Sequence, residues 1–219
     1  MTDASATVSA VAVSTARSAP KSATAVGWAV ATKGAVPRQM GLSRSALEAN
    51  GFEGRTGQVL TVPTGDGVTV AIGIGDPGTI DAAGLRSAAA AFARATAKHA
   101  QLATNLADID GIDAQVAAQA VTEGVLLASY RYTGLKNEPK NASLLEGLTL
   151  VARDKQAKDV DRGAERGKVV ASAAAFAREL ANTPPTHLNA KDLAAKAVDI
   201  GSAAGLLVEV FNKDQLEQM

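Results

Sequence analysis

The sequence has no cysteine and few aromatic residues. None of its 219 residues is cysteine, and aromatic residues make up only 3%. The absence of cysteine excludes disulfides and thiolate metal sites, and it fits a reducing compartment. The apolar fraction of 47%, in which alanine dominates, excludes a disordered chain. Such a set of small side chains favours helices packed closely on a sheet.

The sequence also lacks a net charge and a long apolar run. Lysine plus arginine and aspartate plus glutamate both number 22. A balanced chain has no overall attraction for nucleic acid or an anionic membrane, so neither is expected as a partner. No stretch approaches the ~20 apolar residues that span a bilayer, and residues 1–20 lack the apolar core of a signal peptide. We therefore expect a soluble, cytoplasmic protein.

Alternating hydrophobic periodicities predict an α/β fold. Period-two and β-branched runs predict strands over residues 8–14, 26–32, 57–62, 68–74, 102–107 and 143–152. Helices are expected over 43–50, 79–100, 113–132 and 160–182, with Ser43 and Asp113 as N-caps and Gly51 as a left-handed exit. Residues 64–67 form a hairpin signal, which adds an antiparallel pair. The sheet should therefore be mixed and flanked by helices.

Three- and four-residue spacing predicts the buried face of each long helix. In the first the face comprises Leu85, Ala88, Ala89, Phe92 and Thr96. In the second it comprises Val116, Ala120, Val121, Leu127 and Ala128. In the third we expect Val169, Ala173, Phe176 and Leu180 to face the core.

The C-terminal region begins at an abrupt helix stop. Thr183 precedes Pro184 and Pro185, which do not continue a helix. A further helix over 190–204, an apolar strand over 206–211 and a helix start at 212–214 are expected. A nearly all-apolar strand suits a position covered on both faces and needs neighbours at both edges. Eight residues follow it, so we expect an α/β unit that begins here without its remaining strands.

Residues Gly73 to Gly78 match the dinucleotide-binding pattern G-x-G-x-x-G between a strand and a helix. One interpretation places a phosphate on the N-terminus of the following helix. Against it, Asp76 puts a carboxylate where the phosphate would lie, and Pro77 removes a backbone donor. The favoured interpretation is a tight strand-to-helix turn.

Other candidate site residues have mainly structural interpretations. The segment from Asp108 through Asp110 to Asp113 superficially resembles a calcium loop, but its glycine is at position 4 rather than 6, so a turn that ends in a helix cap is favoured. His99 and His187 have no acidic partner at metal-binding spacing. Residues 131–168 lean basic with interleaved carboxylates, which indicates a solvated face. No nucleophile elbow and no H-E-x-x-H motif occurs.

Three strings resemble a known family. The most specific is Arg178-Glu179-Leu180-Ala181-Asn182-Thr183-Pro184-Pro185, followed by Leu188 and Asp192-Leu193-Ala194. The helix string from Glu123-Gly124 to Tyr132, with Lys136, is a second, and Ile72-Gly73-Ile74-Gly75 before Leu85-Arg86 is a third. Together they resemble the leucyl aminopeptidase (cytosol aminopeptidase) family over nearly the whole chain. His187 stands where that family often carries asparagine.

The resemblance implies a macro-like N-terminal domain over 1–158, a linker helix over 159–182 and the start of a metallopeptidase domain over 183–219. It implies a hydrolase that removes N-terminal residues, often leucine, from peptides with two divalent metal ions, manganese or zinc, and that assembles as a homohexamer. The family's metal-binding strings are absent from this sequence, so no catalytic, metal or cofactor-binding residue is assigned.

We therefore expect this chain alone to be inactive and to serve assembly or positioning. The alternative is a macro-like module that binds a nucleotide or ADP-ribose through the loop from Gly73 to Gly78.

Overall fold

The computed structural model describes residues 8–135 and 143–219. The chain divides into two compact units, Met1–Ala177 and Arg178–Met219. Lys136, named above with the second family string, lies outside the described residues. Among those described, no helix combines the length and apolarity that a membrane span requires.

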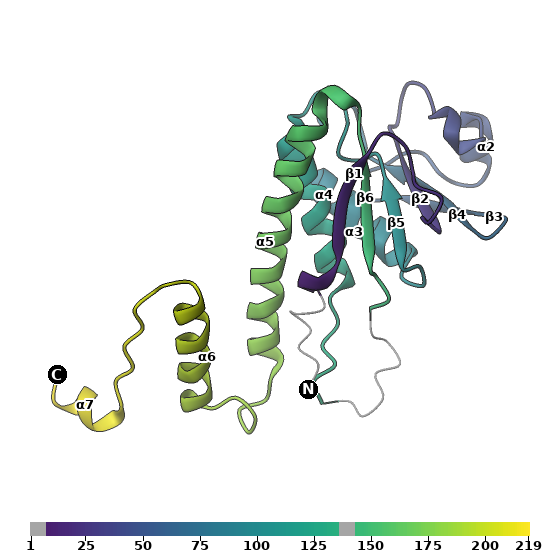
Figure 1. Ribbon diagram of the computed structural model, residues 1–219. Helices are drawn as coiled ribbons and strands as arrows, with labels where there is room; N and C mark the ends of the chain where they lie inside the picture. Colours follow the sequence, from purple (N-terminus) through teal and green to yellow (C-terminus); the bar gives the residue numbers. More distant parts are fainter. Residues whose placement is uncertain (1–7, 136–142) are drawn as a thin grey trace. The chain divides into compact units, whose positions relative to one another are not determined.

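The first unit is built on a six-stranded mixed sheet with the order β1-β6-β5-β2-β4-β3 (Figure 1). The strands are β1 (Ala12–Ala16), β2 (Ala25–Val30), β3 (Val59–Thr64), β4 (Gly67–Gly73), β5 (Gln101–Thr104) and β6 (Gly147–Val151). Every neighbouring pair is parallel except β3 and β4, which form the expected antiparallel hairpin. The prediction of a mixed α/β sheet is confirmed.

The first strand starts later than its sequence pattern predicted. Residues 8–10 are helical, and β1 begins only at Ala12. Val8 and Val11 are both 3% exposed. That three-residue spacing buries one side of a helical turn, whereas a strand would turn the two side chains to opposite faces.

Three helices of this unit begin at caps that their sequences supply, and a fourth, α5, continues beyond the unit's last residue. They are α2 (Arg44–Ala49), α3 (Ala82–Ala95), α4 (Ala114–Ser129) and α5 (Ala157–Asn182), with short 3₁₀ helices η1 (Arg38–Met40) and η2 (Asp154–Gln156). Ser43 and Asp113 accept from the backbone N–H three residues on, as predicted. Asp81 does the same for α3, so this helix starts later than residue 79. Gly51 has a φ of 74°, the left-handed exit expected after α2.

Apolar side chains form separate clusters on the two faces of the sheet. The larger cluster includes Leu85 and Phe92 of α3 and Val121 of α4 against Val70 and Ile72 of β4. The smaller consists of Trp28, Val30, Met40, Leu47, Phe52 and Ala71. Because side chains alternate along β4, its neighbouring residues enter different clusters. Thus α3 and α4 cover one face, and α2 covers part of the other.

The predicted buried faces are right for α3 and wrong for α5. All five residues predicted for α3 are buried. In α4, Ala120 and Val121 are buried but Val116 is 45% exposed. In α5, Val169 is 68% exposed and Ala173 is exposed. The buried residues of α5 are instead mostly small: Val160, Gly163, Ala164, Gly167, Ala171 and Ala175.

Glycine brings the backbones of α3, α4 and α5 into direct contact. A Cβ added to Gly163 would lie well under 3.0 Å from the Gln115 carbonyl oxygen, and one at Gly167 would lie 2.7 Å from that of Gln119. On the other side of α4, a Cβ at Gly124 would overlap the Arg86 carbonyl oxygen of α3. The small stripe of α5 therefore packs because it lacks side-chain volume, whereas Val169 and Ala173 of the predicted stripe are exposed and Phe176 and Leu180 are half-buried.

The second unit contains two capped helices. They are α6 (Ala190–Ala203) and α7 (Lys213–Glu217), each opened by an asparagine capping box, at Asn189 and Asn212. α6 ends in a Schellman motif: Gly205 has a φ of 71°, the Leu206 N–H donates to Gly201 O (2.8 Å), and the Gly205 N–H donates to Ser202 O (3.1 Å).

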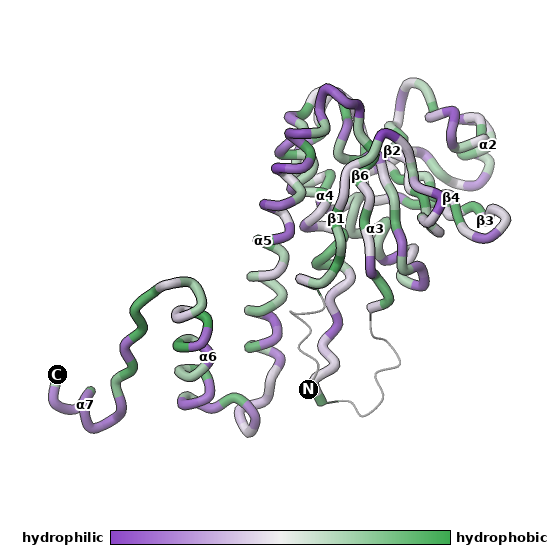
Figure 2. Tube along the Cα trace, in the orientation of Figure 1, coloured by the Kyte–Doolittle hydropathy of each residue, from purple (hydrophilic) through white to green (hydrophobic). Residues whose placement is uncertain are grey.

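The strand predicted over residues 206–211 is not formed. The segment is irregular, and Leu207 is 99% exposed. Figure 2 shows it as a hydrophobic stretch between α6 and α7. A strand needs a neighbour for its backbone hydrogen bonds, and within the described residues no other segment pairs with this one. The prediction of a strand here is therefore wrong for this chain.

The glycine contacts between α4 and α5 generate a stability test. In Gly163→Ala, we expect the clash with the Gln115 backbone to cost about 3 kcal/mol, since neither backbone can move aside easily. The helix propensity of alanine returns about 1 kcal/mol. Urea unfolding followed by circular dichroism should show a net loss of about 2 kcal/mol. Gly65→Ala is the control, because an added Cβ there has no neighbour within 4 Å. Equal stability of the two variants would contradict the packing.

Candidate functional site

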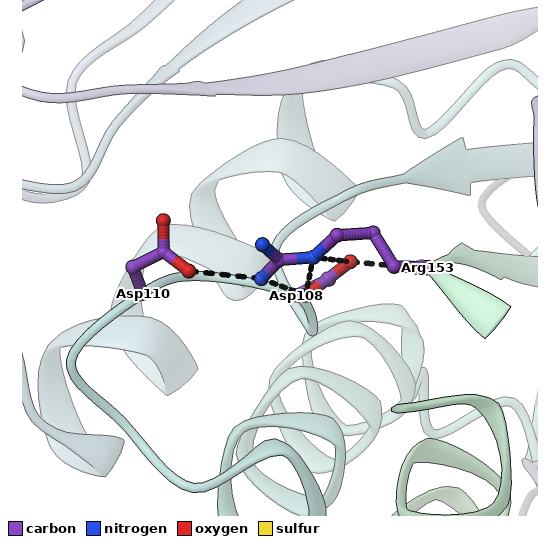
Figure 3. Close-up of polar contacts among 3 residues, drawn as sticks. All are labelled: Asp108, Asp110 and Arg153. Atoms are coloured by element: carbon purple, nitrogen blue, oxygen red, sulfur yellow. Dashed lines mark hydrogen bonds and ion pairs between the residues drawn. The ribbon is translucent and has the colours of Figure 1, made fainter. Parts of the chain in front are cut away.

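The carboxyl ends of the parallel strands β5 and β6 bring three charged side chains together. Asp108 and Asp110 follow β5, and Arg153 follows β6. The Arg153 guanidinium donates to both oxygens of Asp108, from Nη2 (2.6 Å to Oδ1) and from Nε (2.9 Å to each). It also donates to Asp110 Oδ1 (2.9 Å), and the Arg153 backbone N–H donates to Asp108 Oδ2 (2.7 Å). Figure 3 shows the guanidinium between the two carboxylates.

The charges of this cluster stabilise one another. Hydrogen bonding from Arg153, followed by its positive charge, lowers the pKa of Asp110. The hydrogen bonds to Asp108 and Asp110 raise the pKa of Arg153 above its ordinary value. The Asp108 side chain is 7% exposed and that of Asp110 is 90% exposed. Asp108 is therefore the inner partner, and the cluster ties the loop before α4 to the segment that leads into α5.

The G-x-G-x-x-G loop uses its backbone donors within the protein. The Gly75 N–H donates to Gly54 O (2.8 Å), the Gly78 N–H to Asp76 Oδ1 (2.9 Å) and the Thr79 N–H to Asp76 O (3.1 Å). The N-terminus of α3 is separately capped by Asp81, whose Oδ1 accepts from the Gly84 N–H (2.7 Å). These groups are the ones a phosphate would need, so the loop has the geometry of a strand-to-helix turn.

The remaining sequence candidates have structural contacts. Asp113 caps α4 and does not join Asp108 and Asp110 on Arg153. His99 Nδ1 lies 3.1 Å from Thr24 Oγ1 beyond the end of α3. His187 is exposed, and its backbone N–H donates to Pro184 O (2.8 Å) in the double-proline turn. Within the first unit, the structure does not bring His99 to the carboxylates Asp108 and Asp110.

Two residues from separate family-like strings meet between α3 and α4. Arg86 Nε donates to Glu123 Oε2 (2.7 Å), and Gln119 Nε2 donates to Glu123 Oε1 (2.8 Å). Glu123 is only 4% exposed. A buried carboxylate needs such partners, because an unpaired charge in the interior is strongly unfavourable. Its neighbour Gly124 has no side chain and so lets the α3 backbone approach closely. Both family-like strings therefore contribute residues to the same contact between α3 and α4.

The described residues do not fit a divalent metal pair. No group of three or more histidine, cysteine, aspartate or glutamate side chains among them is placed to hold a metal ion. The close carboxylates Asp108 and Asp110 already share a guanidinium. A cation that bridged both carboxylates would compete with Arg153 for them.

The comparisons with known proteins identify the chain's relatives. The sequence matches the family described as "Cytosol aminopeptidase family, N-terminal domain" over residues 30–139, half of the chain's length. The chain belongs to the cytosol aminopeptidase family. It is 34% identical over 174 residues to a probable cytosol aminopeptidase of Mycobacterium leprae, in an alignment covering 79% of this chain and 33% of that protein. With the Corynebacterium diphtheriae counterpart it is 32% identical over 177 residues, covering 78% and 34%.

Two solved structures have a similar fold. The bottromycin maturation enzyme BotP matches with a TM-score of 0.72 and 30% identity, covering 90% of this chain and 41% of that one. A mutant of tomato leucine aminopeptidase matches with a TM-score of 0.81 and 19% identity, covering 95% and 46%. The second likeness concerns the fold alone. This cytosol aminopeptidase family member spans about a third of the length of the relatives it matches in sequence.

Sequence reasoning missed the role of Arg153 in this family member. It considered Asp108 and Asp110 as part of a turn that superficially resembles a calcium loop, and Arg153 only as part of a solvated basic stretch. A usable signal existed: both sides of the contact directly follow predicted strands, and neighbouring parallel strands end at one edge of a sheet. The missing step was that β5 and β6 are neighbours.

The two carboxylates should differ in their effect on stability. We expect Asp108→Ala to lower the free energy of unfolding by about 1–3 kcal/mol, because it leaves the Arg153 backbone N–H and the guanidinium without their inner acceptor. Asp110→Ala, the matched control at the exposed end of the cluster, should have a smaller effect. Urea unfolding of both variants measures the difference. A larger loss for Asp110→Ala would contradict the assignment of Asp108 as the inner partner.

The pKa of Asp110 gives the cluster a defined pH dependence. Since the folded-state pKa lies below the ordinary aspartate value of about 3.9, the ionised carboxylate stabilises the fold above that value. This stabilisation is lost as the pH falls through the folded-state pKa. Carboxyl-carbon NMR from acid to neutral pH should give a depressed pKa for Asp110 that returns toward normal in Arg153→Met. An unchanged pKa in that variant would show that Arg153 is not the cause.

Proposed function

We propose that this chain is the N-terminal portion of a metal-dependent leucyl aminopeptidase. The complete enzyme would remove N-terminal residues, preferably leucine, from peptides with two manganese or zinc ions. The metal ligands and catalytic residues would lie outside this chain. The family match to an N-terminal domain, together with coverage of about a third of each relative, carries this proposal.

One further observation supports the choice of metal. A related structure is described as BotP in complex with Mn, and this chain is 29% identical to it over 90% of its length. Manganese is therefore a reasonable metal for the enzyme to which this portion would belong.

The role that we propose for this chain itself is assembly and positioning. Two of its ionic contacts bind one helix or loop to another: Arg86 with Glu123 joins α3 to α4, and Arg153 with Asp108 joins the β5–α4 loop to the segment before α5. These contacts stabilise a scaffold, and none of them presents a free nucleophile or general base. The assembly proposed for the complete enzyme is a homohexamer in the cytoplasm.

The proposal is tested with the purified chain. Incubation with leucine p-nitroanilide and Mn²⁺ or Zn²⁺ should release no p-nitroaniline above the rate of metal alone. An active leucine aminopeptidase, assayed in the same buffer, shows that substrate and metal are competent. Turnover by the purified chain, abolished by a chelator, would place metal-binding catalytic residues within it and contradict the proposal.

A further inference from the structure

The topology of the first unit creates a position where α/β sheets commonly bind ligands. The chain leaves β2 toward α2, which packs in the smaller apolar cluster, whereas it leaves β4 and β5 toward α3 and α4 in the larger one. Connections therefore diverge to opposite faces of the sheet next to β2. Such divergence opens a crevice at the carboxyl ends of the strands, and this crevice is the usual ligand site of the architecture.

In this protein the chain's own backbone occupies the β2–β4 side of that position. A Cβ added to Gly54, whose φ is 81°, would lie 2.7 Å from Ala31 O, directly after β2. A Cβ added to Gly73 at the end of β4 would overlap Arg55 O, and one at Gly75 would overlap Thr56 Oγ1. Residues 53–58 thus lie against the ends of both strands, at distances that only glycine allows.

Hydrogen bonds hold this segment in place. The Gly75 N–H donates to Gly54 O (2.8 Å), and the Gly57 N–H donates to Gly73 O (2.9 Å). The carbonyl oxygen of Gly54 therefore takes the backbone donor of Gly75 that an anionic oxygen would take in a ligand-binding loop. The Thr32 N–H is used in the same way, since it donates to Gly75 O (2.9 Å).

The side chain of Gln58 forms hydrogen bonds to the backbone within residues 51–58. Its Oε1 accepts from the Glu53 N–H (2.9 Å) and the Arg55 N–H (3.3 Å), and its Nε2 donates to Gly51 O (2.6 Å). One side chain therefore satisfies three backbone groups of a segment that belongs to no helix or strand. On the β5 side of β2, Asn105 Oδ1 accepts from the Ala29 N–H (2.8 Å), so the segment that follows β5 is hydrogen-bonded to β2 as well.

We propose that residues 53–58 form an internal strap, latched by the Gln58 side chain, which closes the crevice at the carboxyl ends of β2 and β4. The strap occupies the position that a ligand would take. The domain therefore keeps a ligand-binding topology, but its own carbonyl oxygens accept the backbone hydrogen bonds that a ligand would accept. Access to the Gly75 N–H requires the strap to open. This inference does not depend on the peptidase activity of any larger protein.

Amide hydrogen exchange of the full chain, resolved by NMR, tests the latch. In Gln58→Ala we expect the Gly75 amide to exchange about tenfold faster, because hydrogen bonds that fix the strap are lost. The amide of Ala103, buried in β5, should be unchanged. Gln58→Glu keeps the acceptor for Glu53 and Arg55 and loses the donor to Gly51, so its effect should be smaller; it also serves if Gln58→Ala does not fold.

Three results would overturn the proposal. If Gly75 exchange is unchanged, or if Gly75 and Ala103 accelerate equally, Gln58 is not a local latch. The wild-type chain is also titrated with ADP-ribose and, separately, with inorganic phosphate at about 1 mM. We expect no amide shifts at Thr32, Gly54 or Gly75. Shifts confined to these amides with either probe would show that the crevice is open in the wild-type protein.

Discussion

The close approach of helix backbones is the constraint on which the first unit depends. α4 lies between α3 and α5, and its backbone meets the Arg86 carbonyl through Gly124 on one side and Gly163 and Gly167 of α5 on the other. A helix layer packed this tightly has little room for large side chains, which accounts for the low aromatic share and the abundance of alanine. The same closeness brings Arg86 of α3 within reach of Glu123, which also accepts from Gln119 one turn earlier in α4, so that a carboxylate can be buried with its hydrogen bonds satisfied.

Sequence periodicity predicted the elements well and failed where packing depends on the absence of a side chain. Along α3, the buried face is marked by Leu85 and Phe92, and hydrophobicity identifies it directly. Along α5, hydrophobicity selects Val169, which is exposed, while the core side is marked by Gly163 and Gly167. A periodicity argument gives weight to large apolar residues and none to glycine. It therefore selects the wrong side of α5, whose core side is marked by glycine and alanine.

Partner-dependent features were also beyond the sequence alone. Residues 206–211 have the composition of a buried strand, yet a strand forms only where another strand supplies hydrogen bonds, and within the described residues none does. Arg153 and Asp108 lie 45 positions apart, and their contact depends on β5 and β6 being neighbours. Caps behaved differently: Ser43 and Asp113 act within one helical turn, and both were predicted correctly. What a residue does within its own turn is encoded locally, whereas strand pairing and ion pairing require the topology.

The carboxyl edge of the sheet shows why a ligand-binding topology does not establish ligand binding. Binding an anion at such an edge requires free backbone donors and a free cation. Here the Gly75 N–H is used by Gly54 O, the N-terminus of α3 by Asp81, and the Arg153 guanidinium by Asp108 and Asp110. Each of these groups would serve a ligand in another protein of similar topology. In this one they hold loops to strand ends.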